Sequence, residues 1–404
     1  MNFRILIFLV LILIPVSTPA ADPTAYVLNT LGESISKINL KTGAIANDII
    51  IVGSGILCYP NQMIIRDSLA LIIASGTNEI QVINLNTEST AYFISTGSVS
   101  NPYWMEIIDD QYLYVSLMYR NSIALIDYVN RVMITEIDIG KSPEGLLLLK
   151  DNLYIACTGF DWGTYEYVPG QVYVYNVLLE EITDSIAVDL NPQHMAYDTL
   201  GRIHVVCTGD YVSEFGKINI IDTYAGEVVE TLDLGGTPGH ISIGPDNIAW
   251  IASAGWDEDG YVYTYHAITG EIFHDNTSPL EVDINCMAVA AYQDSTCFTA
   301  SLTDFVNVID SSGVNLGRYA VGDGPIHIAF NYIPGDANGD FSVNLLDATH
   351  LINWLYKGGP MTAWPYWRAN VNDDATCNLL DVTYILNYLY KGGPRPRVSP
   401  SWIK

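Results

Sequence analysis

A short run of alternating apolar and polar residues recurs seven times along this chain, and the repeat constrains the fold more than any other feature. Each copy closes on Asn, Asp or His, and successive copies lie 43 to 49 residues apart. The closing residues are Asn39, Asn84, Asp127, Asn176, Asp222, His266 and Asp310. A period of this length predicts one supersecondary unit per copy, because a single unit cannot bury its apolar face without neighbours.

A second marker precedes the next apolar run in every copy. It is Pro in six copies and Cys in one, at Pro60, Pro102, Pro143, Pro192, Pro238, Cys286 and Pro325. Between the markers lie β-branched and aromatic runs, such as residues 69–75, separated by turn residues. This pattern predicts about four short strands per copy. Seven copies of four strands predict an all-β, seven-bladed β-propeller.

The copies resemble the YVTN repeats of secreted and surface-layer bacterial propellers. A blade of that family reads Pro-x-Gly-x-Ala, then a strand similar to LYVA, then a strand that ends in Ile-Asp. The resemblance covers about residues 24 to 333. It implies a fold but no activity, because propellers carry many unrelated functions.

The same resemblance implies how the ring closes. In the YVTN family the strand led by Pro is innermost, so residues 325–332 form an inner strand without the rest of its blade, while residues 25–29 begin a blade that lacks its inner strand. We expect the two to pair, because pairing removes exposed sheet edges. The propeller would then span residues 22–333.

The N-terminal segment predicts export. Residues 1–21 contain Arg4, an apolar run and small residues, as a secretory signal peptide does. We therefore expect a secreted protein, extracellular, at the cell surface or in the periplasm. No other stretch approaches the roughly 20 apolar residues of a membrane helix, so we expect no membrane span. With 17 basic and 45 acidic residues, the net charge of −28 disfavours nucleic acid as a partner.

The six cysteines show no CxxC spacing, and the chain is too large to need disulfides for stability. We expect mostly buried thiols. The alternative is one bridge between Cys157 and Cys207, which occupy equivalent repeat positions.

Beyond residue 334 the pattern changes from strands to helices. Two 16-residue segments, starting at Leu345 and Leu379, share 11 identical residues, and each follows a loop rich in side-chain oxygens. Positions 1, 3, 5, 7, 9 and 12 are Asp336, Asn338, Asp340, Ser342, Asn344 and Asp347 in the first loop and Asn370, Asn372, Asp374, Thr376, Asn378 and Asp381 in the second. Calcium takes six to eight oxygens, so the loops predict Ca²⁺ as cofactor, held more tightly where three carboxylates are present than where two are.

Two such loops, 34 residues apart, resemble the type I dockerin, a small α-helical module that binds cohesins. The resemblance implies a dockerin-like domain at 334–396, followed by a tail at 397–404. It also implies a cohesin-like protein or a cell-surface assembly as partner. The loops depart from the family at Phe341 and Ala375, which occupy position 6, where Gly is usual.

Dockerins place partner-reading residues at loop positions 10 and 11. In this chain those positions are Leu345 and Leu346 in the first copy and Leu379 and Leu380 in the second. The resemblance thus implies an apolar docking face that is present twice. The alternative is that the leucines pack the two helices together.

Three histidines occupy the position two residues after the marker: His194, His240 and His327. If the marker starts the inner strand, these side chains surround one mouth of the central channel. Histidine is a common ligand of transition metals. The simpler interpretation is a polar lining of a wet channel, because His327 belongs to a blade that is not adjacent to the other two.

Three consecutive connections between second and third strands are long, and the topology places them on the same face as the histidines. They carry aromatic and acidic residues, which predict a site for a carbohydrate or a cation. The candidate ligand-binding residues are Trp162, Tyr165, Tyr211, Trp256, Asp257, His194 and His240. Packing within the loops is the alternative role of the aromatic residues.

No catalytic motif occurs, and we name no catalytic residue. The leading hypothesis is a non-catalytic secreted protein whose propeller recognises a ligand and whose tail attaches it, with calcium, to its partner. The rival is a polysaccharide-processing lyase or hydrolase on the propeller, targeted by the same tail. Convergence of His194, His240 and a loop carboxylate on one point would favour the enzyme.

Overall fold

The structure is a computed structural model that describes residues 22–66, 68–253, 259–292, 296–340, 342–359, 366–372, 374 and 376–396. The predicted signal peptide at 1–21 and the tail at 397–404 lie outside the described residues, as do Trp256 and Asp257.

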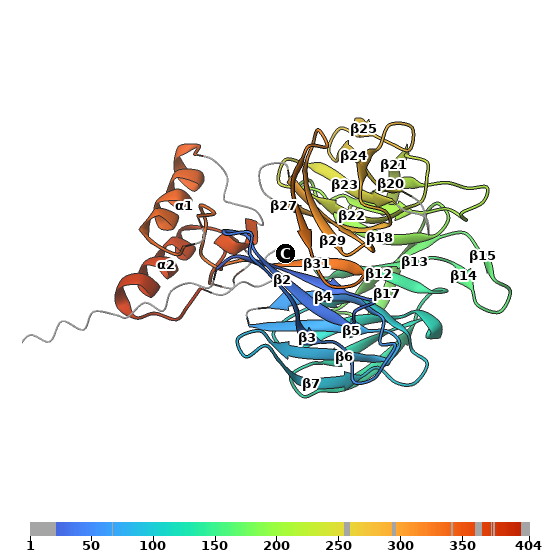
Figure 1. Ribbon diagram of the computed structural model, residues 1–404, viewed down its shortest axis with the longest axis horizontal. Helices are drawn as coiled ribbons and strands as arrows, with labels where there is room; N and C mark the ends of the chain where they lie inside the picture. The colour runs from blue at the N-terminus through green and yellow to red at the C-terminus, as the bar shows by residue number, and fades with distance from the viewer. Residues whose placement is uncertain are drawn as a thin grey trace, which may run out of the picture.

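Seven antiparallel sheets surround a common axis and form the predicted seven-bladed β-propeller (Figure 1). The first three blades in chain order are β4 (Pro60–Arg66), β5 (Leu69–Ala74), β6 (Glu79–Asn84) and β7 (Ser89–Ser95); β8 (Pro102–Ile107), β9 (Tyr112–Leu117), β10 (Ser122–Asp127) and β11 (Val132–Asp138); and β12 (Pro143–Leu149), β13 (Asn152–Cys157), β16 (Gln171–Asn176) and β17 (Glu181–Ala187). A hairpin of β14 (Phe160–Asp161) and β15 (Glu166–Tyr167) extends from the third blade.

The next three blades follow the same order. They are β18 (Pro192–Tyr197), β19 (Ile203–Cys207), β20 (Lys217–Asp222) and β21 (Glu227–Asp233); β22 (Pro238–Ile243), β23 (Ile248–Ser253), β24 (Gly260–His266) and β25 (Ile272–His274), with β26 (Leu280–Val282) beside β24; and β27 (Cys286–Tyr292), β28 (Thr296–Ser301), β29 (Phe305–Asp310) and β30 (Asn315–Ala320).

The seventh blade combines strands from the two ends of the propeller. It reads β31 (Pro325–Asn331), β1 (Thr24–Asn29), β2 (Ser34–Asn39) and β3 (Ile45–Ile51) from the axis outward. Strands β31 and β1 are antiparallel, with Thr24 opposite Asn331. The inner strands β4, β8, β12, β18, β22, β27 and β31 each contact the next and close the ring.

The polar residue that closes each repeat has a local role. The Asn39 Oδ1 atom accepts hydrogen bonds from the backbone N–H groups of Lys41 and Thr42, at 3.0 and 2.9 Å. Asn84, Asn176 and Asp222 make the same pair of bonds to the turns that follow them. Asn and Asp favour this geometry, which fixes the turn between the third and outer strands.

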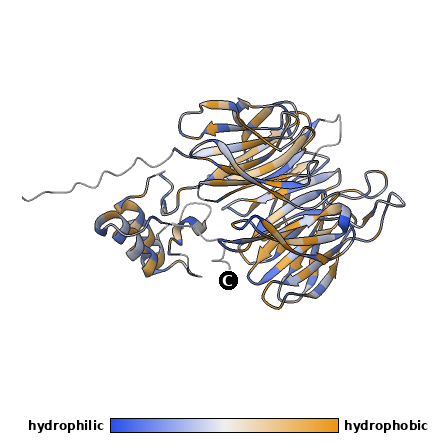
Figure 2. Cartoon of the chain, turned by 90° about the horizontal axis from the view of Figure 1, so that it is seen from below, coloured by the Kyte–Doolittle hydropathy of each residue, from blue (hydrophilic) through white to orange (hydrophobic). Residues whose placement is uncertain are grey.

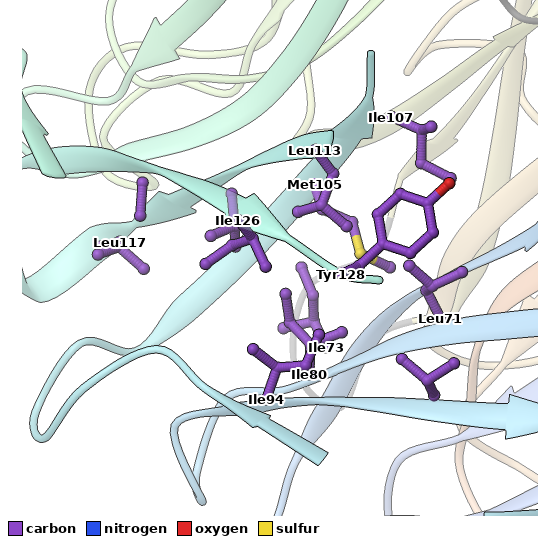
Figure 3. Packing of buried hydrophobic residues seen from close by; sticks show 13 residues of the cluster. Leu71, Ile73, Ile80, Ile94, Met105, Ile107, Leu113, Leu117, Ile126 and Tyr128 are labelled. Carbon is purple, nitrogen blue, oxygen red and sulfur yellow. The ribbon is translucent and has the colours of Figure 1, made fainter. Parts of the chain in front are cut away.

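The apolar core lies between neighbouring blades rather than at the axis. Figure 3 shows Ile73, Ile80 and Ile94 of the first blade packed against Met105 and Ile126 of the second. These side chains are at most 1% exposed. Burying each one contributes about 1.5–3 kcal/mol. All six cysteines are unpaired thiols, so the alternative bridge between Cys157 and Cys207 is absent.

Two α-helices lie outside the propeller, as the views in Figures 1 and 2 both show. They are α1 (Leu345–Lys357) and α2 (Leu379–Lys391), and short 3₁₀ turns occur at η1 (Met118–Arg120) and η2 (Tyr366–Ala369). Both helices begin with a capping box, made by Asn344 with Asp347 and by Asn378 with Asp381. Within the described ranges, no helix has the length and apolar character needed to cross a membrane.

Candidate functional site

The first predicted calcium loop folds around its carboxylates. Asp336 is fully buried, and its Oδ1 atom accepts hydrogen bonds from the backbone N–H groups of Gly339 and Asp340, at 2.9 and 3.0 Å. Asp347 is also fully buried and accepts from the N–H groups of Asn338 and Asn344, at 3.1 and 2.8 Å. The loop therefore turns back on itself and brings positions 1, 5 and 12 into one region.

Burial and charge act together on Asp347. The pKa of Asp347 is raised to about 6: burial is the main cause, the carboxylates of Asp336 and Asp340 contribute to the rise, and two backbone hydrogen bonds oppose it. A cation would relieve this repulsion. No group of three or more His, Cys, Asp or Glu in the described part of the chain has metal-binding geometry by itself, so a calcium ion here would also need amide and carbonyl oxygens.

The second loop repeats the hydrogen bonds of the first. Asp374 Oδ1 accepts from the N–H of Thr376 at 2.8 Å, as Asp340 Oδ1 does from Ser342 at 3.0 Å. Asp381 Oδ2 accepts from the N–H of Asn378 at 2.8 Å, the distance found between Asp347 and Asn344. The two loops therefore share one local fold.

Position 1 of the second loop carries an unsatisfied atom. Asn370 is 1% exposed, and its Nδ2 atom donates to the carbonyl oxygen of Asp374 at 2.6 Å. Its buried Oδ1 atom has no hydrogen-bond partner within the described ranges. Most buried acceptors have a partner. An amide oxygen left free at the first ligand position fits a site that takes a cation.

Arg368 joins the first loop to the propeller. Its guanidinium Nη1 lies 3.4 Å from Asp336 Oδ2, and both side chains are buried. The same guanidinium lies 5.8 Å from the ring centroid of Tyr332, which directly follows β31, the strand that closes the propeller. Phe330 continues this contact, 5.6 Å from Tyr332 and 4.8 Å from Tyr292. The Arg368 guanidinium thus connects Asp336, at position 1 of the first loop, to aromatic residues of the propeller.

The four leucines of the predicted docking face are exposed. Leu345 and Leu379 are each 52% exposed, and Leu346 and Leu380 are each 60% exposed. The helices pack through other residues: Ala348, Leu351, Val382 and Ile385. Packing of the helices is therefore not the role of these leucines, which form two equivalent apolar surfaces.

The three channel histidines gather around an indole. The ring centroid of Trp104 lies 4.5 Å from that of His194, 5.8 Å from His240 and 5.5 Å from His327. His240 and His327 approach to 6.0 Å although a whole blade separates them, because Ala288 between them is small. Gly145 lies on β12, between the strands of Trp104 and His194, and a Cβ there would meet the Gln193 carbonyl oxygen at 2.3 Å.

These histidines are neutral at neutral pH. Burial lowers the pKa of His194 well below its usual value, that of His240 to about 4 and that of His327 to about 3. The ring centroids of His194 and His240 lie 4.8 Å apart, and the indole of Trp104 packs against both. Within the described ranges, no carboxylate is hydrogen-bonded to either histidine. The convergence that would favour the enzyme is not found among the described residues.

A buried acid lies at the start of β12. Glu144 is 8% exposed, burial raises its pKa to about 8, and its Oε2 atom has no hydrogen-bond partner among the described residues. Burial also raises the pKa values of Tyr103 and Tyr167, and the charge of Glu144 adds to both shifts. Sequence patterns gave no signal for Glu144, because the residue after the marker differs in every copy of the repeat.

The long loops present aromatic side chains on the propeller face opposite the helices; Figure 1 shows the β14–β15 hairpin on that side. Trp162 and Tyr165 are 41% and 74% exposed. The Trp162 indole N–H donates to Ser142 Oγ at 2.9 Å, and the Trp162 ring contacts Phe160 and Tyr119. Trp162 is therefore held in place while part of its ring faces solvent.

Tyr211 lies in the next loop and is 50% exposed. Its hydroxyl accepts a hydrogen bond from Gln193 Nε2 at 3.1 Å, which joins this loop to the inner strand β18. Trp256 and Asp257 of the third loop lie outside the described residues, so their predicted role remains a prediction. The structure adds Phe215 and Lys217, which border two hollows beside Tyr211 and were not predicted.

Comparison with solved structures supports the fold. A chain of Kuenenia stuttgartiensis hydrazine synthase superposes with a TM-score of 0.55 and 15% identity over 68% of this chain and 90% of that one. A functionally unknown protein from Desulfotomaculum acetoxidans superposes with a TM-score of 0.58 and 14% identity over 77% of this chain and 99% of that one. Searches against protein families and curated proteins found no match. These similarities show a shared β-propeller fold and do not assign an activity.

Proposed function

We propose that this chain is a secreted recognition protein whose C-terminal part is a dockerin-like, calcium-binding module that attaches it to a cohesin-like or cell-surface partner. The propeller, which resembles YVTN-repeat propellers, is the recognition module. The repeated unit of loop and helix carries the proposal, because both copies combine the same loop hydrogen bonds with an equally exposed leucine pair.

Three features of the loops support calcium. The carboxylates of Asp336, Asp340 and Asp347 lie close enough to raise the pKa of Asp347. Asn370 keeps a buried oxygen without a partner in the described ranges. Amide oxygens, carboxylates and backbone carbonyls are the ligands that calcium takes, usually six to eight of them.

Exposure of the leucines supports attachment. An apolar surface exposed on a small module marks a contact site for another protein. Calcium would fix the positions of the leucines, because each pair lies between the proposed ligands at loop positions 9 and 12. Metal binding of this kind is coupled to folding of the ligand loop.

The test uses the full chain. Calorimetric titration with calcium should give two sites, and circular dichroism should show helicity rising with occupancy. Binding to immobilised type I cohesin domains, measured by surface plasmon resonance, should require calcium and disappear in EDTA. The quadruple variant Leu345→Ser, Leu346→Ser, Leu379→Ser and Leu380→Ser should lose this binding and keep its calcium sites.

A matched control comes from Leu178 and Leu179, an adjacent leucine pair that is 72% and 64% exposed on the propeller. Replacing both with serine should leave cohesin binding unchanged. Absence of calcium binding at millimolar concentration would refute the calcium module. Cohesin binding that survives EDTA, or survives loss of the four leucines, would refute the attachment mechanism.

A further inference from the structure

The loop between β19 and β20 separates two adjoining hollows on the propeller face that carries the exposed aromatic residues. One has a volume of about 520 Å³ and is lined by Ser213, Glu214, Phe215, Lys217, Asp233, Gly235 and Asn276. The other has a volume of about 420 Å³, with Glu214, Phe215 and Lys217 again in its wall. Volumes of 300–1,000 Å³ are typical of sites for small ligands. We call the two hollows together the Phe215 cleft.

The loop that carries Phe215 is fixed by its own hydrogen bonds. Asp210 Oδ1 accepts from the backbone N–H groups of Val212, Ser213 and Glu214, at 2.9, 2.7 and 2.8 Å. The Ser213 hydroxyl, which donates to Asp210 Oδ2 at 2.6 Å, and these backbone bonds hold the pKa of Asp210 well below its usual range. The loop is therefore ordered before any ligand arrives, which lowers the entropic cost of binding.

Glycine allows the loop to pack tightly against the next blade. A Cβ on Gly216 would meet the Pro238 ring at 2.0 Å, so only glycine fits there. The Gly216 carbonyl oxygen accepts from the N–H groups of Leu234 and Gly235, at 3.1 and 2.9 Å. This packing leaves Phe215 50% exposed, between the two hollows.

Lys217 lies among acidic side chains. Its ammonium donates to Asp189 Oδ1 at 2.8 Å, and Glu214 and Asp233 lie close enough to add to the rise in its pKa, which the bond to Asp189 dominates. Asn219 holds the other oxygen of Asp189 at 2.8 Å. Three carboxylates against one ammonium leave the cleft net negative, which disfavours an anion. The ammonium already pairs with Asp189, and an uncharged ligand can bind without displacing this ion pair.

The polar groups of the cleft can hydrogen-bond to hydroxyl groups of a ligand. Carboxylates accept, the Lys217 ammonium donates, and the Asn276 amide does both. The Ser213 hydroxyl, which donates to Asp210 Oδ2 at 2.6 Å, accepts. The exposed face of Phe215 offers an apolar surface to the C–H groups of a ring that stacks on it. An uncharged molecule that combines many hydroxyls with apolar ring faces is an oligosaccharide.

We propose that the Phe215 cleft binds a neutral oligosaccharide, which crosses Phe215 and places one segment in each hollow. This deepens the proposed function, on which it rests, by assigning a ligand class to the recognition module. It needs no calcium, because the two calcium loops lie on the other side of the propeller from the long loops.

Isothermal titration of the full chain with glucose-, xylose- and mannose-based hexaoses tests the proposal. At least one should bind, in EDTA as well as in calcium. Phe215→Ala should weaken that binding by about tenfold or more, the equivalent of 1.4 kcal/mol. Phe93→Ala is the matched control, since Phe93 is 37% exposed on β7 of another blade and should not matter.

A second variant, Asn276→Ala, should weaken the same binding, because it removes one donor and one acceptor from the larger hollow. Failure of all three hexaoses to bind would overturn the proposal, and so would an unchanged affinity in Phe215→Ala. Tighter binding of oligogalacturonate or oligolysine would also overturn it, because the proposed ligand carries no charge. Calcium and cohesin binding in the same samples report separately on the proposed function.

Discussion

The Trp104 indole and the His194 imidazole lie edge to face near the axis of the propeller, with ring centroids 4.5 Å apart and planes at 70°. Trp104 comes from β8 and His194 from β18, two inner strands separated by β12. The contact is possible because β12 carries Gly145 at the equivalent position. Trp104 thus takes the place of an open, water-lined channel at this level.

This arrangement predicts a stability that falls in acid. The pKa values of His240 and His327 lie below those of an unfolded chain, near 6.5, so folding favours the neutral forms. The contribution of the two neutral imidazoles to the free energy of unfolding is complete above pH 6.5. It is lost as the pH falls towards 4 and then 3. In Trp104→Ala, water should fill the space left by the indole and solvate the imidazolium forms. The loss of stability between pH 7 and 5 should therefore be smaller than in the wild type.

Urea unfolding at the two pH values measures this difference. Trp104→Ala should also cost about 3 kcal/mol at pH 7, near the lower end for a buried Trp, because Trp104 is only partly buried. Trp162→Ala, on an exposed hairpin, should leave the acid dependence unchanged. An equal acid dependence in Trp104→Ala and the wild type would contradict the role given to the indole.

Asn370→Asp should strengthen the second calcium site. The substitution supplies a third carboxylate, as in the first loop, and replaces an amide whose Oδ1 has no partner within the described ranges. It removes one hydrogen bond to Asp374, which the ion–carboxylate contact should outweigh. We expect the calcium affinity of the second site to rise by about tenfold, or 1.4 kcal/mol. Calorimetry resolves the two sites, and Asp336→Asn should weaken only the first.

Arg368→Met should destabilise the protein more without calcium than with it. Removing the guanidinium leaves Asp336 as a buried charge without this cation, which typically costs about 3–5 kcal/mol. Calcium at the first loop would supply positive charge to the same carboxylate and reduce that loss. Thermal unfolding in EDTA and in excess calcium measures both conditions.

Arg318→Met is the control for that experiment. Arg318 also combines an ion pair, with Asp283, and a ring contact, with Phe305, but its side chain is 47% exposed. Its loss should cost much less stability than the loss of Arg368, and equally in both conditions, because solvent screens the exposed ion pair. A calcium-independent cost for Arg368→Met would show that calcium and the guanidinium do not act on the same carboxylate.

Glu144→Gln should stabilise the protein at high pH. The folded-state pKa, about 8, lies above the usual value of 4.5 for a Glu, so the wild type loses stability as the pH rises from 4.5 to 8, with no further loss above that interval. At pH 9 the variant should be more stable by roughly 2–4 kcal/mol, and at pH 4 the two should be nearly equal. Urea unfolding at both pH values checks this, with the exposed Glu181→Gln expected to show no such difference.

The repeat pattern predicted most of the fold because its signals are local. Asn39 and its equivalents cap the turns that follow them, and the Pro markers start inner strands such as β4 and β8. Each signal acts over a few residues, so it can be found without knowing the rest of the structure. The two predicted calcium loops rest on signals of the same local kind, and their binding of calcium stays a prediction.

Only the tertiary structure decided what the candidate residues contact. His194, His240 and His327 were placed correctly at one level of the inner strands, but their convergence on Trp104 depends on Gly145 and Ala288, which lie in other blades. Exposure of the four leucines depends on Leu351 and Ile385 filling the space between the helices. Phe215 became a candidate only because the tertiary structure places it in the walls of two neighbouring hollows. Contacts between residues far apart in the chain are set by packing, which a local pattern does not encode.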